Sequence, residues 1–224
     1  MNDNALMKFV KNEWKELVLI ILFYSINFGL WEIIAPIVSK EWASLIVYVI
    51  LFILVIIIFK KELVNEWKEL KSKQFKNRKF WLNILIFLIL DLFLSGLLIY
   101  LTSKLKLDIL PQNNSTVKEQ MIAVPIILTI IQGCIFAPVI EEMTFRFSII
   151  NKRDNKINLV IAFIISIVLF DCIHIVRIEE FFYYLLPSLI LTSFYVKYKN
   201  VFASIILHSI INIVGYIALI IGLL

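Results

Sequence analysis

Long apolar runs constrain this fold more than any other feature of the sequence. Several runs of at least 18 apolar residues alternate with short polar segments. A helix of that length crosses about 30 Å of hydrocarbon. Because lipid offers the backbone no hydrogen bonds, an open chain crosses it only as helices. The chain is 61% hydrophobic, against about 45–50% in soluble domains. These features predict an all-α, polytopic helical bundle in the cell membrane.

Basic residues predict the orientation of the bundle. We expect about seven transmembrane helices, at residues 17–38, 42–59, 80–102, 122–149, 157–176, 181–196 and 200–222. Sixteen Lys and Arg residues fall in segments before odd-numbered spans and five in the others, so the positive-inside rule predicts a cytoplasmic N-terminus. The net charge of +5 therefore indicates contact with the lipid bilayer and sets topology; it does not indicate nucleic-acid binding.

Two basic segments are expected to lie in the membrane interface as amphipathic helices. Residues 1–15 and 60–79 both combine lysines with an apolar stripe, and they share the hexapeptide Asn-Glu-Trp-Lys-Glu-Leu. We divide the chain into N-terminal membrane helices with these segments, residues 1–120, and a helical core, residues 121–224, which together form one membrane domain.

Charged residues stand inside the fourth span. Glu141 and Glu142 are adjacent, and Arg146 follows at i+4 from Glu142. Each such charge costs about 2.5–3.5 kcal/mol on insertion scales, so its presence suggests a function. Glu142 and Arg146 share a helix face, whereas Glu141 points about 100° away, toward a neighbouring helix. A buried pair that only holds helices together is the alternative.

Both histidines of the chain also fall in apolar runs. His174 follows Phe170 by four residues, and Asn212 follows His208 by four. At 1.5 Å per residue, Glu141 and His208 lie about 12–14 Å from the cytoplasmic edge, but His174 lies about 25 Å from it. Straight, untilted helices cannot bring the three together. We therefore expect the boundary of the fifth span to be the largest error in the topology.

These side chains are what amide hydrolysis in a membrane requires. A carboxylate can deprotonate water, and an imidazole can orient that water or pass a proton to the leaving amine. A second imidazole and an amide NH2 can stabilise an oxyanion. Cys134 and Cys172 are expected to be buried thiols without a disulfide; Cys172 is disfavoured as a nucleophile because it lies on a different face from His174.

In order and spacing, the three motifs resemble those of the CPBP (Abi) intramembrane proteases, which include the type II CAAX prenyl endopeptidases. The resemblance covers residues 120–215. It implies that Glu141 activates water, that His174 helps to hold the water, and that His208 and Asn212 form the oxyanion site. Glu142 and Arg146 would then be a supporting pair, and Phe170 belongs to the second motif.

Two departures from the family pattern stand out. Phe147 replaces a small residue after the arginine, and Asp171 adds an acid beside the second motif, where it could share a proton with His174 or raise its pKa. No metal is expected; if one binds, Zn²⁺ held by Glu141, His174 and His208 is the alternative. Asp91 and Glu32 are expected to hydrogen-bond between helices or line a cavity.

Three functions compete. The favoured one is an intramembrane endopeptidase that cuts a hydrophobic or membrane-associated peptide, with peptide processing as its role. A bacteriocin-immunity protein that binds a peptide toxin without cleaving it is the second. A proton- or ion-coupled transporter is the third, but the sequence lacks the inverted repeats and broken helices that this would predict.

Overall fold

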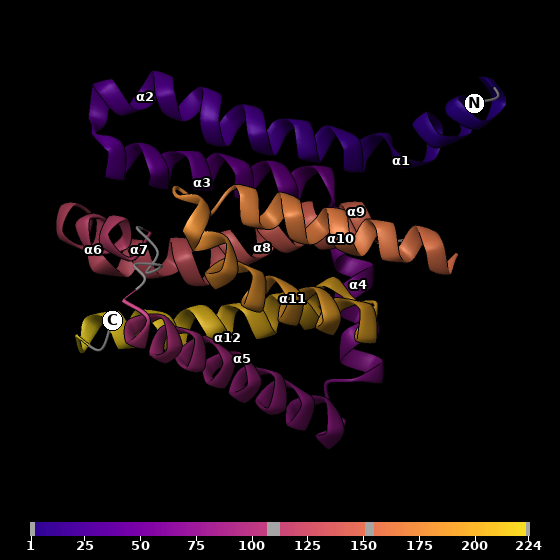
Figure 1. The fold of residues 1–224 in the computed structure, drawn as a ribbon. Coiled ribbons are helices and arrows are strands. Elements are labelled where there is room, and N and C mark those ends of the chain that lie inside the picture. Colours follow the sequence, from indigo (N-terminus) through magenta and orange to yellow (C-terminus); the bar gives the residue numbers. More distant parts are fainter. Residues whose placement is uncertain (1–2, 107–112, 151–154, 223–224) are drawn as a thin grey trace.

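The computed structural model describes residues 3–106, 113–150 and 155–222, and this part of the chain is helical without strands (Figure 1). The first half contains α1 (Asp3–Tyr24), the π-helical η1 (Ser25–Leu30), α2 (Trp31–Val38), α3 (Lys40–Ile58), α4 (Lys60–Lys73) and α5 (Arg78–Lys104). The second half contains α6 (Asn113–Ala123), α7 (Ile126–Ile131), η2 (Gln132–Phe136), α8 (Ala137–Glu141), η3 (Glu142–Phe147), α9 (Ser148–Ile150), α10 (Lys156–Cys172), η4 (Ile178–Glu180), α11 (Phe181–Tyr198) and α12 (Val201–Ile220).

Five continuous stretches are long and apolar enough to cross a membrane. They are Trp14–Val38, Lys40–Ile58, Arg78–Lys104, Ile126–Ile150 and Val201–Ile220. The protein is therefore an all-α, multi-pass membrane protein, as the sequence predicts. The other two expected spans correspond to α10 and α11, which have 17 and 18 residues and run alongside the five. Their crossing of the membrane stays a prediction.

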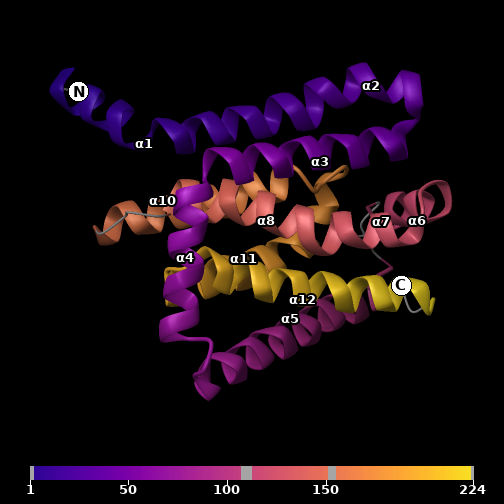
Figure 2. The same cartoon turned by 180° about the vertical axis from the view of Figure 1, so that it is seen from behind.

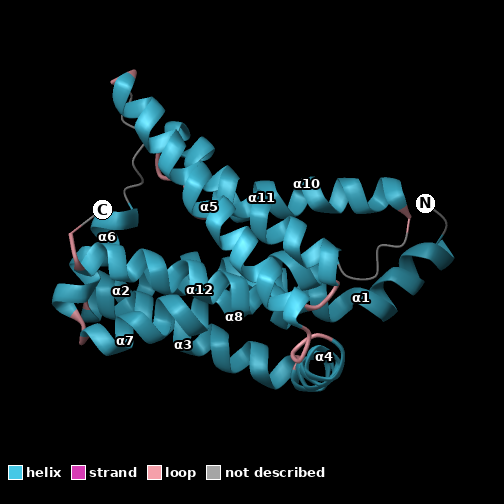
Figure 3. Ribbon diagram, turned by 90° about the horizontal axis from the view of Figure 1, so that it is seen from below, coloured by secondary structure: helices cyan, strands magenta, loops and turns pink. Residues whose placement is uncertain are grey.

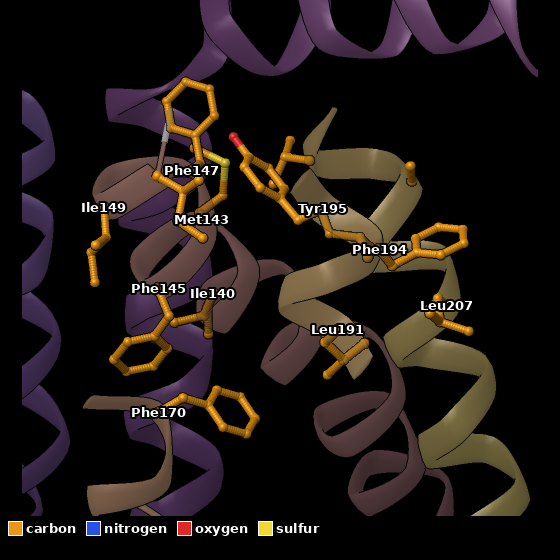
Figure 4. Close-up of a cluster of buried hydrophobic side chains, with 14 of the residues drawn as sticks. Ile140, Met143, Phe145, Phe147, Ile149, Phe170, Leu191, Phe194, Tyr195 and Leu207 are labelled. Carbon is orange, nitrogen blue, oxygen red and sulfur yellow. The ribbon is translucent and has the colours of Figure 1, made fainter. Parts of the chain in front are cut away.

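The stretch Ile126–Ile150 is the central helix of the bundle. Half of its most apolar window is buried, against 11–28% in the other four stretches. Figure 4 shows Ile140, Met143 and Phe147 from this helix in one cluster with Leu191 and Tyr195 of α11. The central helix is continuous from α7 to α9, but η2 and η3 interrupt it with wider π-helical turns. Such turns inside α-helices are often found at functional sites.

Helix α4 lies across one end of the bundle, as expected of an interfacial helix (Figures 2 and 3). Leu63 and Leu70 are its buried face. Glu66 accepts a hydrogen bond from the Val201 N–H at 3.0 Å and so ties α4 to the start of α12. Lys15 of α1 donates to Glu62 of α4 at 2.9 Å. The N-terminal segment differs from the expectation, because α1 runs without a break from Asp3 into the first span.

The fifth span ends earlier than the expected residue 176, and its boundary is where the sequence predicted the largest error. Helix α10 ends at Cys172, so His174 lies beyond the helix, in the connection to α11, and not inside a span. The other end of α10 projects past the ends of α3 and α12, on the side where α4 lies (Figures 1 and 2). This shift along the bundle brings the end of α10 to the level of Glu141. Straight helices that all start at the same membrane edge could not bring the two to one level.

Candidate active site

A cavity of about 500 Å³ lies among α3, α5, the central helix, α11 and α12. The four residues with expected catalytic roles, Glu141, His174, His208 and Asn212, line it, together with Phe170 of the second motif. These side chains come from three segments that are far apart in sequence. The structure thus brings together all four residues to which the sequence assigns catalytic roles.

Glu141 is 3% exposed and directs its carboxylate toward both histidines. Its Oε2 lies 3.9 Å from His174 Nε2 and 3.8 Å from His208 Nε2. Both distances exceed a direct hydrogen bond and suit a water between the groups. The hydroxyl of Tyr48, on α3, donates to the other carboxylate oxygen at 3.4 Å. One oxygen of Glu141 therefore faces two imidazoles across a gap of one small molecule.

The end of α10 orients His174. The His174 backbone N–H donates to Asp171 O at 2.9 Å, so the helix ends and the carbonyl of Phe170 loses its usual partner. His174 Nδ1 lies 2.7 Å from that carbonyl oxygen and forms a hydrogen bond with it. A carbonyl only accepts, so Nδ1 carries the proton and neutral His174 presents the bare Nε2 to Glu141. The ring also lies 4.4 Å from the Phe170 ring centroid.

Glu142 orients His208 and holds Arg146 at the same time. Its Oε1 accepts from His208 Nδ1 at 2.9 Å and from Arg146 Nη1 at 3.0 Å. Glu142 and Arg146 are both fully buried. The Arg146 guanidinium lies 4.2 Å from the centroid of the Phe170 ring, a cation–π geometry. The expected pair therefore exists, and it supports His208 directly from behind the cavity wall.

The π-helical turn η2 explains the position of Asn212. In an α-helix the Ala137 N–H would bond to Gly133 O, but here it bonds to Gln132 O. The next residue, Pro138, has no N–H to offer. Gly133 O instead accepts from Asn212 Nδ2 at 2.7 Å. This leaves the amide of Asn212 fixed at the cavity wall, with its second N–H still available as a donor.

Glycine is required at this turn because Tyr216 packs against it. A Cβ at Gly133 would lie 2.5 Å from Tyr216 Cζ and would overlap the Tyr216 hydroxyl. Tyr216 is one α12 turn beyond Asn212 and also lines the cavity. The close approach of α12 to the central helix thus depends on Gly133.

One expectation for the second motif is wrong, and another has no contact to support it. Cys172 is exposed, and not a buried thiol, because it lies on the outer face at the end of α10; both cysteines are free, as expected. Asp171 is fully buried, but it meets His174 through its backbone carbonyl, and neither of its carboxylate oxygens has a hydrogen-bond partner among the described residues. Proton sharing between Asp171 and His174 therefore has no contact to support it.

Sequence patterns missed several residues of the cavity. Tyr48 comes from α3, in the half of the chain without a recognisable motif, and no spacing relates it to Glu141. Gln120 donates to Gln132 Oε1 at 2.8 Å, and Gln132 donates to Ser44 Oγ at 3.0 Å, which forms a polar chain in the cavity wall. The available signal was a glutamine and a glycine in mid-span, Gln132 and Gly133, six and five residues before Pro138.

The cavity extends toward the end of the bundle opposite α4. From Glu141 its lining continues to Thr116 and Val117 of α6 and to Leu219 near the end of α12. Figure 1 places α6 and the last turns of α12 at the end of the bundle away from α4. Glu141 and His208 are the lining residues of the central helix and of α12 nearest to α4, and they mark the deep end of this cavity.

As donors for a metal, the candidates offer one carboxylate and two imidazoles, and both histidines present Nε2 to Glu141. Carboxylate and imidazole are ligands that zinc accepts. No group of three His, Cys, Asp or Glu side chains within residues 3–106, 113–150 and 155–222 has the arrangement of a metal site.

Comparison with known proteins agrees with the motif pattern. A family model described as type II CAAX prenyl endopeptidase Rce1-like matches residues 123–214, which include the four catalytic candidates. UPF0177 protein YbdI of Lactococcus lactis subsp. lactis (strain IL1403) is 32% identical over 175 residues, 77% of this chain and 92% of the relative. UPF0177 protein YxdF of the same strain is 41% identical over 85 residues, 36% of this chain and 44% of the relative. No solved structure matches.

Proposed function

Since the chain belongs to the CPBP family, which includes the Rce1-like type II CAAX prenyl endopeptidases, we propose that it is an intramembrane endopeptidase that uses a water activated by Glu141. Its substrate would be a hydrophobic or membrane-associated peptide. The observation that carries the proposal is the convergence of Glu141 Oε2 with the Nε2 atoms of His174 and His208, at 3.9 and 3.8 Å, inside a cavity.

In this mechanism Glu141 is the general base. A water between Glu141 and His174 gives its proton to the carboxylate while its oxygen attacks the carbonyl carbon of the scissile bond. Neutral His174 accepts a hydrogen bond from the water at Nε2, because its Nδ1–H is held by Phe170 O. Tyr48, which donates to Oε1, keeps the carboxylate oriented with Oε2 toward the water.

His208 and Asn212 then stabilise the tetrahedral oxyanion. His208 Nδ1–H is already bonded to Glu142, so Nε2 would donate to the oxyanion in the imidazolium form. Asn212 supplies its second amide N–H. When the C–N bond breaks, the leaving nitrogen takes the proton that Glu141 removed from the water, so protons balance over the cycle. One oxyanion donor of this kind is worth about 2.7–4 kcal/mol.

The proposal needs no metal ion. The alternative, a catalytic zinc, would use Glu141, His174 and His208 as ligands and would supply a metal-activated water. The two versions differ in one consequence. A chelator leaves the glutamate-dependent enzyme active and removes the activity of the zinc enzyme.

The orientation of the cavity indicates how the substrate arrives. The basic helix α4 marks the cytoplasmic end by the positive-inside rule, and the cavity extends to the opposite end. We infer that a peptide enters from the outer side of the membrane and is cut at the deep end of the cavity.

This access also supports the second candidate function, a bacteriocin-immunity protein. A cavity that opens outward could hold a peptide toxin without cleaving it. Protection by such a binder would survive loss of the general base, whereas protection by a protease would not.

The test is cleavage of a quenched-fluorescent peptide library by the purified protein in liposomes. Cleavage that is lost in Glu141→Ala and His208→Ala, and kept with chelator, supports the proposal. Loss with chelator and recovery with Zn²⁺ would replace it by the zinc mechanism. Protection of cells from a peptide toxin by Glu141→Ala, without any cleavage by the wild type, would favour the binding protein.

A further inference from the structure

A second carboxylate, Asp91, lies in the same cavity without a role in the mechanism. It is near the middle of α5 and is 4% exposed. Its Oδ1 is buried and has no hydrogen-bond partner among the described residues. A buried carboxylate oxygen without a hydrogen-bond partner in a membrane span is costly, and such an atom in a folded protein calls for an explanation. A ligand that supplies the missing partner would be one.

Helix α5 contributes two polar residues, Asp91 and Ser95, to the cavity lining. They are four residues apart, which puts them on the same face of the helix. Their neighbours Leu90, Leu92 and Phe93 point outward and are 42–63% exposed. Asp91 is thus the one acid on α5, and it lines the space where the proposed substrate would lie.

The charges around the cavity favour a cation at Asp91. Two carboxylates line it, Asp91 and Glu141, and no Lys or Arg among the described residues does. Arg146 is fully buried and committed to Glu142, so it compensates neither acid by direct contact. The two histidines also line the cavity, but even with His208 as an imidazolium the two acids outnumber the cations, and such a lining favours ligands of positive charge.

We propose that Asp91 is a specificity-determining residue that binds a positively charged group of the substrate, the side chain of Lys or Arg or a free amino terminus. The inference rests on the proposed function only in that the ligand is the peptide to be cleaved. Asp91 forms the recognition subsite, and Glu141 carries out the chemistry. A cation on the peptide gains a buried partner at Asp91, whereas a neutral or acidic residue leaves Asp91 unpaired or repelled.

The experiment uses the full-length protein in liposomes and peptides that differ at one position, which carries Lys, norleucine or Glu. The position is moved along the peptide, on both sides of the scissile bond. The wild type should prefer the Lys peptide over norleucine by about 30-fold or more at one position, mainly through KM. Asp91→Asn should lose that preference, Asp91→Glu should keep most of it, and Asp91→Lys should shift it toward the Glu peptide.

Glu32→Gln is the matched control, because Glu32 is also an acid in a span but is exposed and does not line the cavity. It should leave the preference unchanged. An equal Lys-to-norleucine ratio in the wild type and in Asp91→Asn would overturn the proposal.

A binding measurement separates this inference from the proposed function. Peptides with an N-methylated backbone resist cleavage, and their fluorescence anisotropy reports binding even if the protein is not a protease. Tighter binding of the Lys peptide to the wild type, lost in Asp91→Asn, supports the subsite even if no peptide is cut. Equal binding of the Lys and norleucine peptides would overturn the subsite. A preference for Lys that is abolished by K⁺ but not by choline would also overturn it, because that result indicates a site for an inorganic cation.

Discussion

Removing Arg146 should destabilise the protein because it leaves Glu142 buried without its cation. Glu142 Oε1 holds two donors, Arg146 Nη1 at 3.0 Å and His208 Nδ1 at 2.9 Å, and Oε2 has no partner among the described residues. In Arg146→Met the buried carboxylate keeps only the imidazole. Breaking a buried pair on one side costs about 3–5 kcal/mol. Loss of the contact with the Phe170 ring adds about 0.5–2 kcal/mol.

The second half of this prediction concerns the double variant. Glu142→Gln with Arg146→Met removes both charges together, and replacing a whole buried pair by uncharged groups of similar size is often close to neutral. We expect the double variant to lose less than about 2 kcal/mol, although each single change costs about 3–5 kcal/mol. Its activity should still be low, because the carboxylate that accepts from His208 Nδ1 and orients the ring is gone.

The assay is reversible unfolding in mixed micelles, followed by circular dichroism, for the wild type, both single variants and the double variant. The four free energies of unfolding give the coupling between the two residues. A double variant as unstable as the sum of the single variants would refute the reasoning, because it would mean that the two charges do not compensate each other.

Three further predictions concern other parts of the chain. Gly133→Ala should cost about 1–3 kcal/mol by overpacking, and Tyr216→Leu in the same chain should restore part of it, as thermal unfolding in detergent would show. In a background without the native cysteines, a membrane-impermeant maleimide should label Val117→Cys in intact cells. It should label Ser72→Cys, on α4, only after permeabilisation. The reverse pattern would place the open end of the cavity on the cytoplasmic side. Burial is the largest single influence on Glu62 and pushes its pKa upward, but the Lys15 hydrogen bond, a backbone hydrogen bond and the charges of Lys15 and Lys61 together lower the pKa overall. A lowered pKa stabilises the folded state at pH above the unfolded-state pKa. The stability difference between wild type and Glu62→Gln, under about 1 kcal/mol, should therefore be present at neutral pH and vanish as the pH falls below the folded-state pKa of Glu62, as urea unfolding at several pH values would show.

The site residues were predictable because each belongs to a short local pattern. Glu142 and Arg146 pair at i+4, and Phe170 and His174 meet at the same spacing, so the sequence alone indicates which side chains share a face. Hydropathy indicated the helical bundle for the same reason, since the length of an apolar run reports directly on a span. The lysines and the apolar stripe of α4 predicted an interfacial helix, and α4 lies across one end of the bundle, as such a helix would.

What the sequence could not predict depends on contacts between distant segments. Tyr48 meets Glu141 only because α3 packs beside the central helix, and no local spacing encodes that contact. The shift of α10 along the bundle results from packing, so a common membrane edge placed His174 at the wrong depth. The π-helical turns were missed because periodicity arguments assume 3.6 residues per turn, and Gly133 with Pro138 marks the place where that assumption fails.

The most direct test of the account is the kcat/KM of Glu141→Gln in proteoliposomes, measured beside Glu32→Gln with the best peptide from the library. Glutamine keeps the size of the side chain and removes its basicity. We expect a loss of about 100- to 10,000-fold in Glu141→Gln, with unchanged thermal unfolding, and no loss in Glu32→Gln. Activity of a folded Glu141→Gln within a few-fold of the wild type would contradict the claim that Glu141 activates the water.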